Sequence, residues 1–474
     1  MVRSRSEPDG GRGAWTAGAL GLALVTAWLV TTVPTGERFW LVALWASWIL
    51  SFVWLFVRRS FSLATAGLFI AMLLFVVQPA TAAVLQGHVK IAGYNFDPGA
   101  AQALRIATLA QVSLWAGVWA SQRWFPRPSV TRLTTPIPAK RLETAAVVSI
   151  GAAILATLAF AVLTKADIRK LIAYTSGGYH SFTATAAPGS QGAYLLAIQL
   201  VAGMALILLP LRLALGRPRG WLLSGGVALL ASGLLLAGAA RGRFLVPALA
   251  ALLVWLKTSK RMPDARVVAV VGTLGLIVLT SVVGVARGAT GDRSITPSNL
   301  VSYQLGSGSD LWSPIAGLAE HVPSQQHFLH GTSYLEMFVF PVPRAIWHNK
   351  PQGATSTLVR QFDPGVAGLA FPEFGEAYAN FGMLGVALAS FVVALLAEWL
   401  WGRLARASTA TAAVGFSVCF SVLAQVFVRG AIAPMVTQNL ILLVLAVPVT
   451  RWATGAGTGA GARPPARSQR PAFV

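Results

Sequence analysis

Cysteine and charge are both scarce in this chain. One cysteine, Cys419, stands among 474 residues, so no disulfide can form within the chain and a redox-active thiol pair is excluded. Only 11% of the residues are charged, whereas a soluble domain usually carries roughly a quarter. Apolar residues make up 55% of the chain and leave few long hydrophilic stretches. The composition therefore predicts a membrane protein without a large soluble domain.

Acidic residues are outnumbered, with 15 against 37 basic residues, and the net charge is +22. Such an excess can mark a nucleic-acid-binding protein when it gathers on one face. Here the basic residues lie mainly between apolar segments, where Lys and Arg keep loops on the cytoplasmic side of a membrane. We therefore expect membrane lipids as partners and no nucleic acid.

Long apolar runs recur along the chain, most of them near the roughly 20 residues that cross a bilayer as a helix. They predict an all-α polytopic protein with about 12 transmembrane helices. The stretches are 14–33, 38–57, 62–85, 101–121, 143–164, 191–211, 221–240, 243–256, 266–286, 379–400, 409–428 and 434–450. The stretch 243–256 is short for a span, so a tilted helix, a locally thinned bilayer and a re-entrant segment all remain open.

The basic residues set the expected orientation. With the N-terminus in the cytoplasm and 14–33 retained as the first helix, 23 of the 37 basic residues fall on the inner side, and every inner loop carries some. The interpretation places both termini in the cytoplasm of a bacterial inner membrane. It divides the chain into four parts: helices 1–9 over residues 1–286, a large extracytoplasmic loop over 287–376, helices 10–12 over 377–452, and a disordered tail over 453–474.

The external loop is unusually rich in aromatic residues for a solvent-exposed connection. They are Tyr303, Trp312, Phe328, Tyr334, Phe338, Phe340, Trp347, Phe362 and Phe371. A loop this long usually has a function or is disordered. The aromatic content favours a folded cap with short helices, lying on the bundle.

Basic residues on the outer side oppose the orientation signal and so need an explanation. The principal ones are Arg241, Arg243, Arg287, Arg344, Lys350 and Arg360. Arginine binds phosphoryl oxygens through its planar fork, so this set predicts an anionic ligand such as a phosphate. The simpler alternatives are snorkelling to lipid headgroups, or pairing with Glu373, Glu376 or Asp363.

Candidate bases also lie on the outer side. His321, His327 and His330 cluster, but their spacing matches no zinc signature, so no metal and no cofactor is expected. Glu376 and His330 could each take a proton from a hydroxyl group. The helices show no acidic residue well inside the membrane, which argues against a proton-coupled or ion-coupled transporter.

Three motifs resemble those of the Wzy-type O-antigen or oligosaccharide repeat-unit polymerases. Residues 341–351 read PVPRAIWHNKP, residues 371–385 read FPEFGEAYANFGMLG, and residues 238–243 read GAARGR. The number of helices, the position of the loop and the order of the motifs also agree with that family.

The resemblance implies a C-type glycosyltransferase fold. It also implies transfer of a growing glycan from an undecaprenyl-diphosphate carrier to another lipid-linked repeat unit, with inversion and without a metal. In that reaction Arg344 would act with Glu376 or His330 in catalysis. Arg241, Arg243, Arg287, Lys350, Arg360 and Tyr378 would bind the diphosphate. A flippase and a chain-length regulator are the further partners that it implies.

Other functions stay open at this point. An O-antigen ligase-like enzyme hands the glycan to a different acceptor, and a lipid-linked oligosaccharide flippase or other transporter performs no chemistry. The polyprenyl-phosphate-sugar transferases resemble one another in a paired acidic motif in the first external loop, where this chain has Glu37 alone. The peptidoglycan polymerases of the shape, elongation, division and sporulation group agree in helix number, but their motifs are absent from the sequence.

Overall fold

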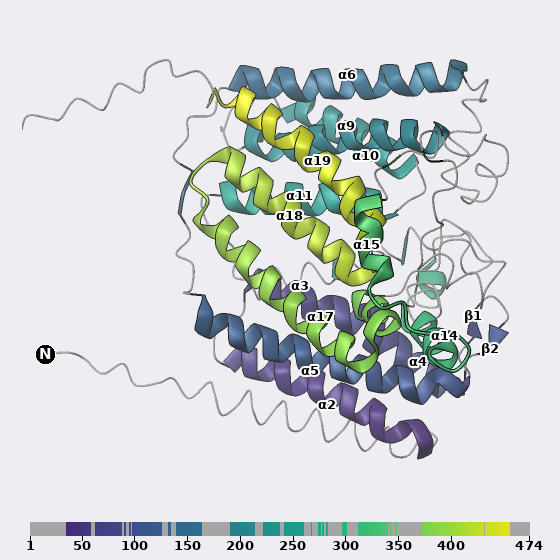
Figure 1. The fold of residues 1–474 in the computed structure, drawn as a ribbon. Helices are drawn as coiled ribbons and strands as arrows, with labels where there is room; N and C mark the ends of the chain where they lie inside the picture. Colours follow the sequence, from purple (N-terminus) through teal and green to yellow (C-terminus); the bar gives the residue numbers. More distant parts are fainter. Residues whose placement is uncertain are drawn as a thin grey trace, which may run out of the picture.

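The structure is a computed structural model in which long helices run side by side (Figure 1). The residues that it describes are 35–57, 62–87, 90–91, 94–95, 97–125, 131–133, 139–163, 190–213, 221–237, 241–259, 267, 274–275, 277–278, 281–282, 296–300, 311–339, 342, 347, 372–430 and 432–455.

The first half of the chain is helical apart from one small hairpin. Its described elements are α2 (Thr35–Val57), α3 (Leu63–Met72), the π-helical turn Leu73–Val77, α4 (Gln78–Leu85), β1 (Lys90–Ile91), β2 (Tyr94–Asn95), the 3-10 turn Asp97–Gly99, α5 (Ala100–Trp124), α6 (Ala139–Leu163) and α9 (Ser190–Leu213). The strands β1 and β2 pair antiparallel. The segment from α3 to α4 is one apolar helical stretch, Leu63–Leu85.

The second half adds two kinds of helix. The long ones are α10 (Trp221–Ala237), α11 (Arg241–Thr258), α17 (Glu373–Arg406), α18 (Ala410–Arg429) and α19 (Ile432–Ala453). Two short helices, α14 (Ser313–His321) and α15 (Thr332–Val339), lie in the predicted external loop. Short helices are what the aromatic content of that loop predicted.

Two hydrophobic cores hold the bundle together. One joins α2, α3, α4, α5, α14 and α17, and the other joins α6, α9, α10, α11 and α19. Helix α18 belongs to both, because Ala413, Phe420 and Phe427 face the first core. Residues Ala410, Val414 and Val418 on another side of the same helix face the second core. The two halves are thus joined along α18, and α11 also takes part in both cores through Leu253 in the first and Val254 in the second.

The described helices confirm a polytopic helical membrane protein. Among the described residues, seven helices are long and apolar enough to cross a membrane, and three shorter apolar helices accompany them. Each falls on one of the predicted stretches, whereas 14–33 and most of 266–286 lie outside the described residues. The total of 12 helices therefore stays a prediction.

The questionable stretch 243–256 forms a nearly full-length helix. Helix α11 has 18 residues, or about 27 Å at 1.5 Å per residue, close to the thickness of a bilayer core. It packs along α9 and α18. The helix extends beyond the predicted stretch at both ends, so that Arg241 lies in its first turn and Lys257 in its last.

One end of the bundle gathers the helix ends that charge assigned to the inner side. Lys257 at the end of α11 donates hydrogen bonds to the carbonyl oxygens of Thr131 (2.5 Å) and Ala405 (2.6 Å). The backbone N–H of Thr131 also donates to Ala405, at 3.1 Å. The last carbonyls of a helix have no partner within it, so these bonds satisfy the end of α17. We name this side the basic end.

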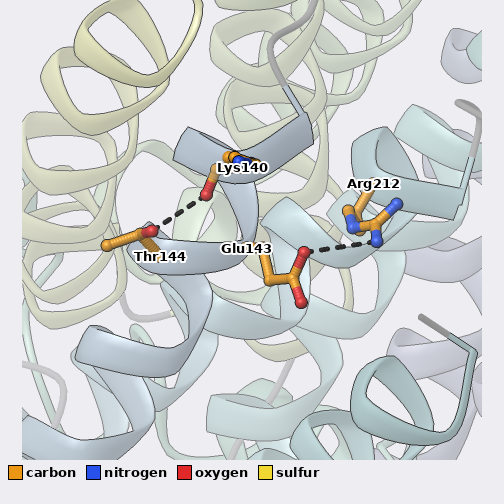
Figure 2. A network of polar contacts seen from close by, with 4 residues as sticks. All are labelled: Lys140, Glu143, Thr144 and Arg212. Atoms are coloured by element: carbon orange, nitrogen blue, oxygen red, sulfur yellow. Dashed lines mark hydrogen bonds and ion pairs between the residues drawn. The ribbon is translucent and has the colours of Figure 1, made fainter. Parts of the chain in front are cut away.

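A second tie at the basic end joins α6 to α9. The Arg212 guanidinium lies 3.3 Å from the Glu143 carboxylate, and Thr144 donates a hydrogen bond to the carbonyl of Lys140 (Figure 2). Arg212 is buried, so its charge needs this partner. The ends of α9 and α6 therefore lie together, as alternating inner and outer loops require.

Glu398 qualifies the expectation that no acidic group lies within the helices. It stands in the long limb of α17 and accepts hydrogen bonds from the hydroxyl groups of Ser62 and Thr65. Ser62 caps the N-terminus of α3 by accepting from the backbone N–H of Thr65 at 2.9 Å. A helix N-terminus favours negative charge, so Glu398 joins α17 to α3. Its role is structural.

Helices α5 and α17 approach closely because a glycine lies between them. A Cβ atom at Gly117 would meet the carbonyl oxygen of Phe391 at 2.5 Å and the Cβ of Ala394 at 2.8 Å. Small residues at helix crossings allow such contact in membranes. Gly151 in α6, by contrast, has no neighbour within 4 Å of a built Cβ.

Gly117→Ala should therefore destabilise the bundle, because overpacking typically costs about 1–3 kcal/mol. We expect a lower thermal midpoint of the detergent-solubilised protein. The matched change Gly151→Ala should keep or raise that midpoint, since alanine favours a helix over glycine. Equal midpoints for the two variants would contradict the close packing of α5 on α17.

Candidate functional site

The first turn of α17 carries two buried carboxylates. The helix begins after Pro372, whose carbonyl accepts the N–H of Gly375 at 2.8 Å. Glu373 and Glu376 lie one turn apart, 3% and 1% exposed. The positive end of the helix dipole favours acidic residues there. The hydropathy pattern placed these residues at the end of the predicted loop, but they belong to the helix.

A kink at Gly382 separates this turn from the long limb of α17. Gly382 has φ +62° and ψ −149°, a conformation that suits glycine alone. A Cβ at Gly385 would meet the carbonyl oxygen of Ala377 at 2.3 Å, so the two limbs are tightly folded on each other. Figure 1 shows the shorter limb turned out of line beside α14 and α15.

The kink frees backbone carbonyls that then accept hydrogen bonds from the turn that precedes α15. In a straight helix, the carbonyls of Ala379 and Asn380 would accept from the residues four positions later. Here they accept from the N–H groups of Leu329 (2.9 Å) and His330 (3.1 Å). His330 and Gly331 both have positive φ, +48° and +87°, which turns these amides towards the kink. The turn and the kink therefore depend on each other.

Asn380 locks this arrangement with its side chain. Its Oδ1 accepts the N–H of Gly331 at 2.9 Å. Its Nδ2 donates to the hydroxyl of Ser333 at 2.7 Å and to the carbonyl of Glu376 at 2.8 Å. Asn380 is 0% exposed, so each of these bonds replaces water that burial excludes.

Tyr334 of α15 holds the first carboxylate. Its hydroxyl donates a hydrogen bond of 3.0 Å to Oε1 of Glu373. Burial, followed by the charges of Glu373 and Glu376, raises the pKa of the Tyr334 phenol above its ordinary value. The phenol therefore keeps its proton and remains a donor to the carboxylate.

Glu376 connects the same turn to α19. Its Oε2 accepts the backbone N–H of Ile432, at the start of that helix, at 3.0 Å. The first N–H groups of a helix have no partner within it, and an anion there is favoured. Glu376 thus fixes where α19 begins.

Tyr378 connects α17 to α14. Its hydroxyl donates to the carbonyl of Val322, which follows α14, at 3.0 Å. Its ring meets Phe328 edge to face at 6.2 Å. Helix α14 in turn lies against the turn before α5, where a Cβ at Gly99 would meet the carbonyl oxygen of Ala316 at 2.0 Å. We call this end of the bundle the carboxylate end.

The predicted site residues divide into three groups. Glu376, Tyr378 and His330 lie at the carboxylate end, the first two buried and His330 exposed on its turn. For Arg241 and Arg243 the structure describes only the backbone, which forms the first turn of α11 at the end opposite Lys257. Four more predicted residues lie outside the described residues: Arg287, Arg344, Lys350 and Arg360. Whether the cations converge stays a prediction.

Several residues of the network carried no assignment from sequence. Asn380 and Gly382 stand inside the recognised stretch 371–385, but asparagine and glycine have no charge to signal a role. Tyr334 stood only among the aromatic residues of the loop. Ser333 gives no sequence signal, because its partner Asn380 lies 47 positions away.

The fold and this network define a polytopic helical membrane protein with a buried, carboxylate-bearing site at one end. The family model for O-antigen polysaccharide polymerase Wzy matches residues 19–453, and the chain belongs to this family. The resemblance seen in the sequence is thereby confirmed. Membership supports an O-antigen polymerase role, and the family acts on lipid-linked oligosaccharide repeat units. Neither the curated proteins nor the solved structures contain a significant match.

Asn380→Leu tests the link between kink and turn. Leucine has nearly the same shape as asparagine but makes none of the three hydrogen bonds of Asn380. Each buried polar group left unsatisfied costs roughly 1–3 kcal/mol. We expect faster hydrogen–deuterium exchange at residues 329–331. Asn439→Leu, which alters a buried asparagine in α19 that bonds to Gln425, should leave exchange at 329–331 unchanged. Equal protection in the Asn380 variant would refute the link.

Proposed function

We propose that the chain is a membrane polysaccharide polymerase. It transfers a growing glycan from an undecaprenyl-diphosphate carrier to a lipid-linked repeat unit, on the outer face of a bacterial inner membrane. The observation that carries this proposal is the family match over residues 19–453. The carboxylate end supplies groups that suit the chemistry.

The orientation follows from the two ends of the bundle. Arg212, Lys257 and Arg403 stand at the basic end, and cytoplasmic loops are rich in such residues. The carboxylate end then faces outward, with both termini in the cytoplasm. A C-type glycosyltransferase arrangement with about 12 helices accompanies this proposal.

The leaving group determines what the cations do. Departure of a lipid diphosphate builds up negative charge on phosphate oxygens, and fixed positive groups stabilise that charge in the transition state. We assign this role to six cations: Arg344, Arg241, Arg243, Arg287, Lys350 and Arg360. Tyr378 is proposed to bind the diphosphate with them. Guanidinium groups bind phosphate bidentately, so the reaction needs no metal.

A base must accept the proton of the attacking sugar hydroxyl. The resemblance gives this role to Glu376 or His330, and both lie at the carboxylate end. One displacement at the anomeric carbon inverts its configuration. A flippase that delivers repeat units and a protein that sets chain length are the proposed partners.

Purified protein in lipid vesicles, supplied with lipid-linked repeat units, tests the proposal. Wild-type protein should produce a ladder of glycan lengths, and Arg241→Ala and Arg344→Ala should abolish it. Arg123→Ala is the matched control, because Arg123 stands in the last turn of α5 and stacks on Trp119 at 3.9 Å. The control should keep the ladder.

Two other results would each contradict one part of this proposal. Transfer of a single glycan to a different acceptor would indicate a ligase. Normal ladders from wild-type and both arginine variants would remove the proposed role of the cations.

A further inference from the structure

Two carboxylate oxygens of the carboxylate end, Oε2 of Glu373 and Oε2 of Glu320 in α14, lack a hydrogen-bond partner within the described part of the chain, and Glu373 is the more deeply buried residue. Glu373 is 3% exposed, and its Oε1 accepts the hydrogen bond from Tyr334. Its Oε2 is buried and has no hydrogen-bond partner within the part of the chain that the structure describes. The two oxygens of this carboxylate are therefore in different environments.

An arrangement of this kind is unfavourable unless a ligand completes it. Burial of an unpaired carboxylate oxygen costs free energy, and most buried polar atoms in proteins are hydrogen-bonded. An ionised carboxylate only accepts hydrogen bonds, so the partner that suits this form of Glu373 is a donor. Among the groups that the family's lipid-linked oligosaccharides carry, sugar hydroxyls are abundant donors.

The neighbouring carboxylate is engaged differently. Glu376 accepts the backbone N–H of Ile432 with Oε2, which fixes it to the start of α19. That backbone group cannot move away without unwinding the first turn of the helix. Glu376 therefore suits a positioning role, and Glu373 has a buried oxygen without a partner among the described residues.

We propose that Glu373 is a catalytic residue whose Oε2 binds the acceptor sugar hydroxyl and accepts its proton. The proposal rests on the glycosyl transfer proposed above and changes which carboxylate serves as base. Glu376 and Tyr334 are positioning residues in it. Tyr334 orients the carboxylate through Oε1 and leaves Oε2 for the acceptor.

The step balances in atoms and electrons. The acceptor O–H bond breaks and its proton moves to Glu373 Oε2. The acceptor oxygen forms the new glycosidic bond at the anomeric carbon of the donor glycan. The bond between that carbon and the diphosphate oxygen breaks, and the lipid diphosphate leaves with the electron pair. Glu373 then releases the proton to solvent.

Replacing each carboxylate with the isosteric glutamine distinguishes the role of Glu373 from that of Glu376. A general base typically contributes roughly 10²–10⁴-fold to the rate, so Glu373→Gln should lower kcat by about 100-fold or more. Its thermal midpoint should stay near that of the wild-type protein, because glutamine keeps an oxygen for Tyr334. Glu373→Asp should recover part of the activity. Glu398→Gln is the matched control, since it alters a carboxylate of the same helix that bonds to Ser62 and Thr65.

The pH–rate profile distinguishes a base from a structural residue. Wild-type activity should fall on the acid side as the base becomes protonated, and the residual activity of Glu373→Gln should lack this fall. Glu376→Gln should lower the thermal midpoint and keep the acid-side fall. Tyr334→Phe, which removes the donor to Oε1, should reduce kcat by about tenfold or more, because the carboxylate loses the hydrogen bond that orients it.

The measurements apply to whichever transfer the wild-type protein performs. If the product is a single transfer, polymerase function fails, and a loss in Glu373→Gln still supports the role of Glu373. If wild-type protein makes a ladder and Glu373→Gln keeps kcat within threefold, the role of Glu373 is refuted and polymerase function stands. No transfer by wild-type protein would overturn both.

Discussion

The break in α17 at Gly382 is the constraint on which the carboxylate end depends. It leaves the carbonyls of Ala379 and Asn380 without helical partners, and the amides of Leu329 and His330 supply them. Because a buried carbonyl without a partner is costly, the turn and the kink stabilise each other. Together they place Tyr334 beside the first turn of α17, where its hydroxyl donates a hydrogen bond to Glu373.

The two ends of the bundle differ in the polar chemistry that they bury. At the basic end, cations meet backbone carbonyls or a carboxylate, as Lys257 and Arg212 show, and the helices are tied together. At the carboxylate end, acidic groups meet N–H and O–H donors, and Glu373 has one oxygen without a partner among the described residues. Helices between the ends pack through apolar surfaces, with close approach where a small residue permits it. The buried groups that suit the proposed chemistry therefore lie at one end.

Hydropathy located the helices because each needs a long apolar run, whatever it packs against. Hydropathy placed the start of α17 too late, because charged residues such as Glu373 and Glu376 are typical of a loop. In the structure both lie in the first turn of the helix, and Glu376 accepts a hydrogen bond from the start of α19. Motif resemblance predicted roles for Glu376 and Tyr378, and both lie at the carboxylate end. It could not find the bonds of Asn380, because they join segments far apart in the sequence and depend on a backbone break. The convergence of Arg344 and Lys350 on this end remains a prediction.

Photo-cross-linking to a lipid-linked repeat unit tests most directly whether the carboxylate end is the site of polymerisation. A photoreactive residue would replace the exposed His330 in one variant and the exposed Lys140, at the start of α6, in another. An adduct with the repeat unit at position 330, and none at position 140, is the predicted result. An adduct at position 140 alone, in protein that still extends glycans, would place the reaction at the wrong end of the bundle and contradict the assignment.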